Sequence, residues 1–325
     1  MTAPQDHGPS TQRSTPPEHN RWLRDEVLRS LLATPKTLPP KLFYDATGAD
    51  LFERICTLPE YYPTRAELEI LRTHARDIAS LAGPACALVE YGSGAGVKVR
   101  VLLNALDRPA AYVPIDISGQ QLARVASTIS AEYPDLLVRP VRTDYTAPLV
   151  LPPMPTAARR VAFFPGSTIG NFHPTEAAAF LHRIRRTVGE NGALVLGVDR
   201  VKSTQVLNAA YNDSQGVTAA FNLNLLARIN RELGADFQLE QFQHRAFFNG
   251  EARRIEMHLV SLVSQTVTVS GIHVAFEKGE TIWTESSYKY NATRLTELAG
   301  SAGFTIVRRW TDAQSRFWVA YLEAA

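Results

Sequence analysis

Short apolar runs alternate with helix-length amphipathic segments through the middle of the chain. Buried strands are expected at the apolar runs 88–91, 112–115, 136–141, 161–164 and 193–198. Apolar residues at helical spacing lie between these runs, at 98–106, 122–131 and 177–188. Strands that alternate with helices predict an α/β fold with a doubly wound, mostly parallel sheet, which binds its ligands at the carboxyl ends of the strands.

The pattern is different before the first of these strands. Pro, Ser, Thr, Gln and His dominate residues 1–19, which predicts a disordered tail. A helix is predicted from residue 21 until Pro35 ends it, and the aromatic stretches 39–45, 48–52 and 58–63 are expected to be loops. Thr64 and Glu67 have the spacing of a capping box, which predicts a helix through Leu81.

The alternation of strands and helices stops after residue 200. A long helical segment is predicted over 209–233, strands at 242–248, 255–263 and 266–276, and an extended segment at 280–290. A helix at 294–302 and an antiparallel pair at 304–310 and 317–322 then close the chain. Residues 201–286 are too many for a plain connection. We therefore expect an inserted α+β substrate-binding domain (20–61 and 201–286) beside a nucleotide-binding domain (62–200 and 287–325).

Composition and charge narrow the classes of partner. Of the 325 residues, 45% are hydrophobic and 20% charged, as in an ordinary soluble globular protein. The net charge of +2 gives no electrostatic case for binding nucleic acid or an anionic membrane, and no apolar run is long enough to span a bilayer. We expect a cytoplasmic monomer that binds a small molecule, with no nucleic-acid or membrane partner.

A protein-bound metal is not expected from the sequence. Cys56 and Cys86 are the only cysteines, too few for a zinc site or a disulfide framework. The eight histidines show no paired ligand spacing.

A glycine-rich turn follows the first predicted strand. Glu90 comes directly before it, and the turn contains Gly92, Gly94 and Gly96. Dinucleotide sites and S-adenosylmethionine (SAM) sites both use a strand, a glycine turn and a helix, but a dinucleotide fingerprint would need a glycine where the chain has Val97. The acid followed by glycines resembles motif I of class I SAM-dependent methyltransferases. The motif alone fits a structural glycine turn equally well.

Further polar residues stand at the predicted strand ends. Asp116 could accept hydrogen bonds from the ribose hydroxyls of a nucleoside, and Asp144 with Tyr145 could bind its adenine, although each aspartate could also be a helix cap. Lys98 could meet the carboxylate of SAM or be a solvated surface lysine. Asn171 could orient an amine without favouring its protonated form, since an amide offers both donors and an acceptor.

Longer motifs are spread along the whole chain after the tail. They are KLFYD at 41–45, LPEYYPTR at 58–65, GSTIGN at 166–171, AYND at 210–213, GVTAAFN at 216–222, RIEM at 254–257 and TESS at 284–287. Together they resemble the L-histidine Nα-methyltransferases of ergothioneine biosynthesis. The resemblance implies a class I SAM-dependent methyltransferase domain whose parallel sheet has an antiparallel edge, and trimethylation of the α-amine of histidine to hercynine.

The same resemblance implies the residues of the site. The carboxylate and amine of histidine would be held by Tyr61, Asn171 and Tyr211, with the Gly166 backbone nearby. Glu285 and Ser287 would hold the imidazole, Met257 would shape the ring pocket, and Tyr44 would assist through its hydroxyl or a water. Catalysis would then depend on Asn171 and Tyr44, and SAM would be bound by Gly92, Lys98, Asp116, Asp144 and Tyr145.

Two positions depart from the family pattern, and other functions stay open. Tyr91 replaces the usual leucine of the glycine motif, and Ser286 lies between the two imidazole ligands, which puts fine substrate preference in doubt. The nearest alternative is a SAM-dependent N-methyltransferase for another aromatic amino acid or amine. A nucleic-acid methyltransferase is disfavoured by the missing basic stripe, and a non-catalytic SAM-binding regulator would bind SAM without turnover.

Overall fold

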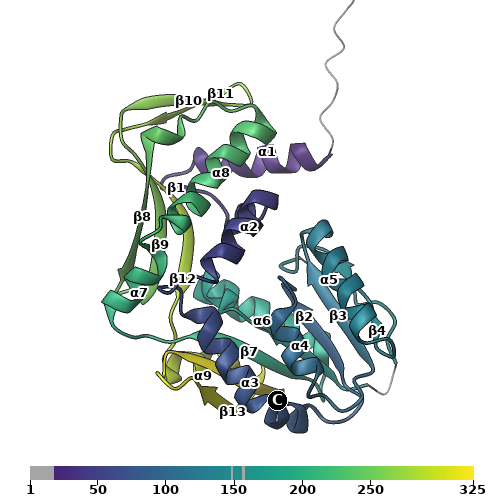
Figure 1. The fold of residues 1–325 in the computed structure, drawn as a ribbon. Coiled ribbons are helices and arrows are strands. Elements are labelled where there is room, and N and C mark those ends of the chain that lie inside the picture. The colour runs from purple at the N-terminus through teal and green to yellow at the C-terminus, as the bar shows by residue number, and fades with distance from the viewer. Residues whose placement is uncertain (1–17, 148, 156–157) are drawn as a thin grey trace, which may run out of the picture.

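The computed structural model describes residues 18–147, 149–155 and 158–325 (Figure 1). The first helix, α1 (Glu18–Leu31), takes in the last two residues of the predicted tail, 18 and 19, so that boundary was placed too late. The rest of the predicted tail, residues 1–17, lies outside the described residues.

The larger of two main sheets confirms the predicted parallel core and antiparallel edge. Its strands are β2 (Ala87–Tyr91), β3 (Ala111–Asp116), β4 (Leu137–Val138), β5 (Val141–Arg142), β6 (Arg160–Phe164), β7 (Ala193–Asp199), β13 (Phe304–Thr311) and β14 (Phe317–Ala324). They run in the order β13-β14-β7-β6-β2-β3-β4, with β5 also paired to β3. Strands β7 to β4 are parallel, and β14 is antiparallel to both β7 and β13. The single strand predicted at 136–141 is instead the pair β4 and β5, interrupted where Pro140 has no N–H to donate.

Helices cover both faces of this sheet. One face packs against α3 (Pro63–Ala82), α4 (Val97–Leu103) and α5 (Gly119–Glu132), and the other against α6 (Pro174–Val188) and α9 (Ala292–Ser301). Side chains of β7 divide between the two faces as a strand requires: Val195 belongs to the first core and Leu194 to the second. This is the doubly wound arrangement that the hydrophobic pattern predicts.

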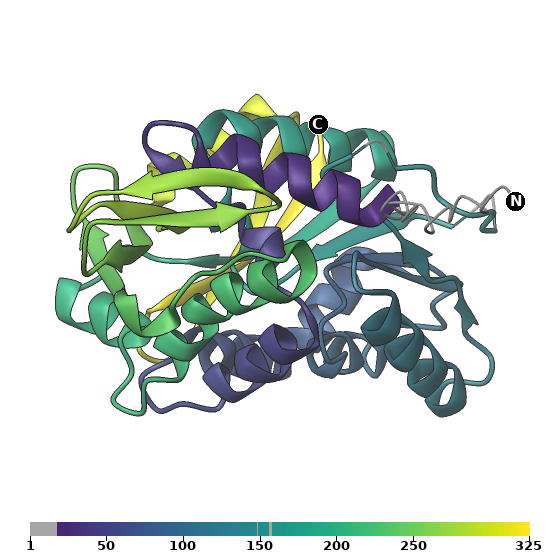
Figure 2. The same cartoon turned by 90° about the horizontal axis from the view of Figure 1, so that it is seen from above.

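A second, four-stranded sheet forms from both ends of the chain. Its order is β1 (Lys36–Thr37), β12 (Thr281–Tyr288), β9 (Arg254–Ser261) and β8 (Phe242–Asn249). Strands β8, β9 and β12 of this sheet stand on one side of the molecule, away from α5 and β3 (Figure 1), and the view from above shows the same separation (Figure 2). The domain boundary expected between residues 286 and 287 falls inside β12.

Two expectations for the C-terminal half were wrong in detail. The single helix predicted at 209–233 is α7 (Thr204–Tyr211) followed by α8 (Val217–Leu233). Asp213 lies between the two helices, and its carboxylate accepts hydrogen bonds from the N–H groups of Val217 and Thr218, at the start of α8, at 2.8 and 2.7 Å. The run at 266–276 is a hairpin of β10 (Gln265–Val269) and β11 (Ile272–Phe276), whose turn contains Ser270 and Gly271, both with positive φ.

The N-terminal segments also correct the predictions. Residues 48–52 are helical, within α2 (Ala46–Ile55), which Asp45 caps by accepting a hydrogen bond from the Gly48 N–H at 2.8 Å. The capping box at the start of α3 is absent: Tyr62 is the N-cap residue and makes no side-chain cap hydrogen bond. Glu67 is instead fully buried (0% exposed) and faces the larger sheet. Among the described residues, no helix is both long and apolar enough to cross a membrane.

Candidate functional site

The residues predicted to bind SAM lie along the carboxyl edge of the parallel strands. Gly92 follows β2, Asp116 ends β3 and Asp144 comes two residues after β5, while Gly166, a predicted substrate residue, comes two residues after β6. Parallel strands end at one edge, so these positions meet there. Glu90, the acid before the glycine turn, is buried beneath this edge and accepts a hydrogen bond from the Tyr112 hydroxyl at 2.5 Å.

Asp116 contacts the glycine-rich turn directly. Its carboxylate accepts hydrogen bonds from the Ser118 N–H at 2.9 Å and the Ser93 hydroxyl at 3.5 Å. Burial raises the pKa of Asp116, although N–H groups of Ser118, Ser93 and Gly94 act in the opposite direction. The carboxylate therefore lies beside the turn, where a bound nucleoside would meet both.

Tyr145 and Asp144 form the other side of this edge. The Tyr145 ring lies 6.0 Å from the Phe164 ring and 5.6 Å from the Phe180 ring, and a Cβ atom at Gly92 would be 3.9 Å from its Cε1. Asp144 accepts a hydrogen bond from the Thr146 N–H at 2.9 Å, as in an Asx turn, and pairs with Lys41 at 3.6 Å. A flat aromatic side chain therefore faces the turn across Gly92.

Lys98 connects this edge to a second site. Its Nζ is 2.5 Å from Glu67 Oε2, and the same carboxylate accepts the N–H of Gly166 at 3.0 and 2.9 Å. A Cβ atom at Gly166 would be 3.6 Å from Lys98 Nζ. Glu67 thus contacts both Lys98, predicted to bind SAM, and Gly166, predicted to bind the substrate. Its capping-box spacing concealed this role in the sequence.

A pocket next to Gly166 brings together most of the predicted substrate residues. It is lined by Tyr44, Phe52, Tyr61, Pro63, Gly166, Ser167, Thr168, Asn171, Asp199, Tyr211, Glu285, Ser287 and Lys289. Asn171 comes from the 3-10 helix η2 (Thr168–Asn171), which packs against β12. A Cβ atom at Gly170 would be 2.8 Å from the Tyr288 carbonyl oxygen, so only glycine allows this close approach. The approach places Asn171 beside the strand that presents Glu285 and Ser287.

Four polar side chains in the pocket have no hydrogen-bond partner within the described protein. They are the hydroxyls of Tyr44 and Tyr61, the amide of Asn171 and the carboxylate of Glu285. All four side chains are part-buried, and each lines the pocket. A polar ligand bound in the pocket would therefore complete their hydrogen bonds.

Burial controls the electrostatics of the pocket. It raises the pKa of Glu285 to about 7, although the nearby Lys289 ammonium acts in the opposite direction. Burial also raises the pKa values of Tyr44 and Tyr61 well above their ordinary value, with Glu285 adding to the shift. Both phenols are therefore neutral hydrogen-bond donors at physiological pH.

Met257 is the one predicted substrate residue outside the pocket lining. It is buried (1% exposed) and lies directly opposite Glu285 in the β9–β12 register. Directly opposed residues share a face of the sheet. Met257 therefore lies beside the Glu285 side chain on the same face of the second sheet.

Sequence reasoning missed Asp199 and Lys289, which also line the pocket. Both are fully or almost fully buried, and Lys289 Nζ is 2.9 Å from Asp199 Oδ2. A signal for Lys289 was present in the chain, because it follows Glu285 and Ser287 at the two-residue spacing that places strand residues on one face. For Asp199, its place at the end of the fifth predicted strand was the signal.

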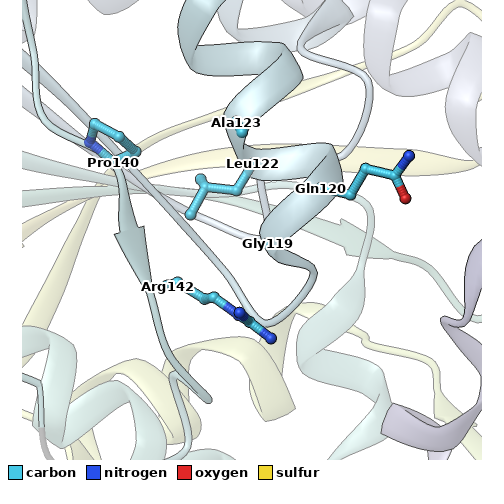
Figure 3. A pocket seen from close by; sticks show the side chains of 6 residues that line it. All are labelled: Gly119, Gln120, Leu122, Ala123, Pro140 and Arg142. Carbon is cyan, nitrogen blue, oxygen red and sulfur yellow. The ribbon is translucent and has the colours of Figure 1, made fainter.

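Another hollow lies beside the start of α5. Figure 3 shows Gly119 and Gln120 at the start of α5, with Pro140 and Arg142 on the neighbouring segment. The Arg142 side chain points toward Gly119, where an added Cβ atom would be 3.0 Å from Arg142 Cδ. None of the predicted site residues lines this hollow.

Comparisons with known proteins identify relatives of this chain. A histidine N-alpha-methyltransferase from Mycolicibacterium smegmatis is 43% identical over 300 residues, which cover 91% of this chain and 92% of that protein. Ergothioneine biosynthesis protein 1 from Neurospora crassa is 30% identical over 85% of this chain, which spans 32% of that longer protein. A solved structure of a possible exported protein from Bordetella parapertussis shares the fold, with a TM-score of 0.50, 12% identity, and coverage of 94% of this chain and 96% of that one.

A family model covers almost all of the described chain. It is described as histidine-specific methyltransferase, SAM-dependent, and it matches residues 23–324. The match spans the parallel sheet with its glycine turn, the second sheet and the pocket that joins them. The chain belongs to the histidine-specific, SAM-dependent methyltransferase family.

Proposed function

We propose that this protein transfers methyl groups from SAM to the α-amino nitrogen of L-histidine, giving hercynine in ergothioneine biosynthesis. The observation that supports this most strongly is the pocket of unpaired polar groups next to the carboxyl edge of the sheet. Its polar groups match an amino acid with a hydrogen-bonding ring. Membership of a SAM-dependent family supports SAM as the methyl donor. Relatives named histidine N-alpha-methyltransferase support histidine as the substrate.

The carboxyl edge has the features that SAM needs. Asp116 would accept the ribose hydroxyls, while Asp144 and Tyr145 would take the adenine. The φ of Gly92 is +80°, which glycine adopts without strain, and its backbone lies next to the Tyr145 ring. Lys98 would bind the methionyl carboxylate, close to Gly166 and hence to the second pocket. SAM would supply an already activated methyl group there.

The second pocket would hold histidine by both of its polar ends. Tyr61, Asn171 and Tyr211 would bind the α-carboxylate and the α-amine, and Glu285 and Ser287 would bind the ring. Tyr44 would contribute a neutral hydroxyl, directly or through a water. Because Gly170 brings η2 against β12, the groups for the amine and for the ring stand side by side.

Methyl transfer requires a neutral amine aligned with the methyl group. The pKa of a peptide α-amino group is about 8, and the free carboxylate of histidine raises that of its own α-amine, so the site must favour the neutral form. The Asn171 amide could accept an amine N–H without stabilising the ammonium as a carboxylate would. Each of the three transfers would be preceded by the loss of one proton from the nitrogen in its ammonium form, and the third leaves a quaternary nitrogen without a proton. Positioning with exclusion of water would provide most of the rate.

We propose that the two sheets belong to domains with separate functions. The second sheet, with α1, α2, α7 and α8, would be the substrate-binding domain, and its boundary is better placed after Tyr288, where β12 ends. We further propose that the enzyme works as a monomer, without a metal or a nucleic-acid partner.

Mass spectrometry of purified protein incubated with SAM and L-histidine tests the proposal. Successive additions of one, two and three methyl groups on histidine are expected. Tryptophan, tyrosine and histamine are incubated in parallel, and the variant Asn171→Ala serves as the matched control because it retains the SAM edge.

Each outcome has a defined meaning. Histidine methylated while histamine is not would support both the ring and the α-carboxylate assignments. Methylation of tryptophan or tyrosine but not histidine would show that the assigned substrate is wrong. SAM binding without any product would support a non-catalytic regulator.

A further inference from the structure

Lys289 is a buried cation for which the proposed function so far has no role. It is 1% exposed, and its Nζ lies 2.9 Å from Asp199 Oδ2, 2.8 Å from Ser287 Oγ and 3.2 Å from the Tyr211 hydroxyl. An ammonium has three N–H donors. All three are used inside the protein, so Lys289 can act on a substrate only through the groups that it holds.

The two hydroxyls that Lys289 holds are also bonded to each other. The Tyr211 hydroxyl donates to Ser287 Oγ at 2.9 Å. Ser287 therefore accepts two hydrogen bonds, from Lys289 and from Tyr211, and a hydroxyl has only two acceptor positions. The Ser287 hydroxyl proton is therefore its one remaining hydrogen-bonding group, and Ser287 lines the pocket, where this proton can be donated to a ligand.

Glu285 provides the opposite polarity on the same face of β12. Its carboxylate has no partner within the described protein and, when ionised, can only accept hydrogen bonds. A fixed donor and a fixed acceptor thus stand two residues apart. A neutral imidazole has one lone pair and one N–H, whereas an imidazolium has two N–H groups.

We propose that Lys289 is a positioning residue that, by occupying Ser287 and Tyr211, makes the pocket specific for a neutral imidazole ring. This inference rests on the proposed function. The ammonium fixes Ser287 as a donor to the ring nitrogen that has the lone pair, while Glu285 accepts from the other ring nitrogen. Tyr211, which accepts from Lys289 and donates to Ser287, retains a lone pair for an N–H of the α-amine.

The charges around Asp199 keep Lys289 in its ionised form. Burial acts to lower the pKa of Lys289, but the Asp199 carboxylate and the Tyr211 oxygen outweigh it, so the pKa is raised. Lys202 also pairs with Asp199, yet burial lowers its pKa to about 8. Tyr62 donates to both oxygens of Asp199 at 2.8 and 2.7 Å. Asp199 therefore keeps partners when either lysine is removed.

These two lysines provide a matched pair of variants. Lys289→Met and Lys202→Met each remove one ammonium from Asp199, but Lys202 does not touch Ser287 or Tyr211. Lys289→Met is expected to raise the KM for histidine at least about tenfold, the scale of hydrogen bonds from a charged group. The KM for SAM should stay unchanged, and Lys202→Met should leave both values within about twofold.

A double-mutant cycle shows whether Lys289 acts through Ser287. Lys289→Met is made in the wild type and in a Ser287→Ala background. The increase in the logarithm of the histidine KM should be less than half as large in the Ser287→Ala background as in the wild type. Additive effects, or an equal loss from Lys202→Met, would overturn the inference and leave Lys289 as charge compensation for Asp199. If Lys289→Met does not fold, Lys289→Gln replaces it in the same cycle.

Failure of the proposed function is distinguishable from failure of this inference. A wild-type protein that methylates no histidine refutes the proposed function before any variant is compared. A wild-type protein that methylates histidine, combined with an uncoupled Lys289, refutes only the role of Lys289.

Discussion

The carboxylate of Glu67 lies directly against Gly197, in the middle of β7. A Cβ atom at position 197 would be 1.9 Å from Glu67 Oε1, closer than any real Cβ contact. The missing side chain is what lets Glu67, on α3, reach both the Gly166 N–H and the Lys98 ammonium. One buried carboxylate therefore connects the proposed SAM edge with the proposed histidine pocket.

Gly197→Ala should destabilise the protein and lower its activity. The added methyl group must displace the Glu67 carboxylate, so the free energy of unfolding should fall by roughly 1–3 kcal/mol, as for overpacking of other cores. Chemical denaturation measures the loss. Gly300→Ala, a glycine in α9 with no heavy atom near its absent Cβ, is the control and should be neutral or stabilising.

Glu67→Gln should weaken SAM binding more than it weakens the fold. The amide has nearly the same size and can still occupy the space at Gly197, but it no longer neutralises Lys98. We expect the dissociation constant for SAM, measured by titration calorimetry, to rise about tenfold. The reason is that the charge-assisted contact with Glu67, which holds the Lys98 ammonium in place, is replaced by a neutral one. Glu69→Gln, on the exposed side of the same helix, should leave SAM affinity unchanged.

The activity on histidine should fall as the pH drops through about 7. The Glu285 carboxyl has a pKa of about 7, raised by burial above its ordinary value of 4.5, so it is protonated below that pH. Only the ionised form accepts the imidazole N–H, and kcat/KM reports the titration of the free enzyme. Glu285→Gln should remove this step from the pH profile of kcat/KM and leave the titration of the histidine ring.

The control for the pH profile is Glu280→Gln. Glu280 lies just before β12. Burial acts to raise the pKa of its carboxyl, but the Lys36 ammonium and the Glu277 N–H outweigh burial and lower the pKa. It is therefore ionised throughout the range of interest. A step near pH 7 that persists in Glu285→Gln would refute the assigned titration.

The double variant Glu285→Ala with Met257→Ala should relax the pocket toward a larger aromatic amino acid. The two residues are direct partners across β12 and β9, so their removal opens one continuous space. We expect kcat/KM for histidine to fall at least about a hundredfold, because the ring loses its hydrogen-bonding partner. Competition assays with tryptophan measure the gain, and unchanged histidine kinetics would contradict the ring assignment.

Much of the architecture could be read from the chain. The alternation of strands and helices from 88 to 199 predicted the parallel sheet, and its strand ends located Asp116 and Gly166 correctly. Errors occurred where local signals compete: a capping-box spacing at Glu67 concealed a buried carboxylate, and apolar continuity across 209–233 concealed the break at Asp213. Helical periodicity does not register a single turn when both flanks are apolar.

The sequence by itself determined most of the elements, the parallel sheet with its antiparallel edge and the identity of most residues in the pocket, because motifs and periodicity are local. Only the tertiary structure decided which of these residues touch. Gly170 admits η2 against β12, Gly197 admits Glu67 beneath Gly166, and Lys289 meets both Asp199 and Tyr211. These are contacts between segments about 80 to 130 residues apart in the chain, and no pattern within one segment encodes them.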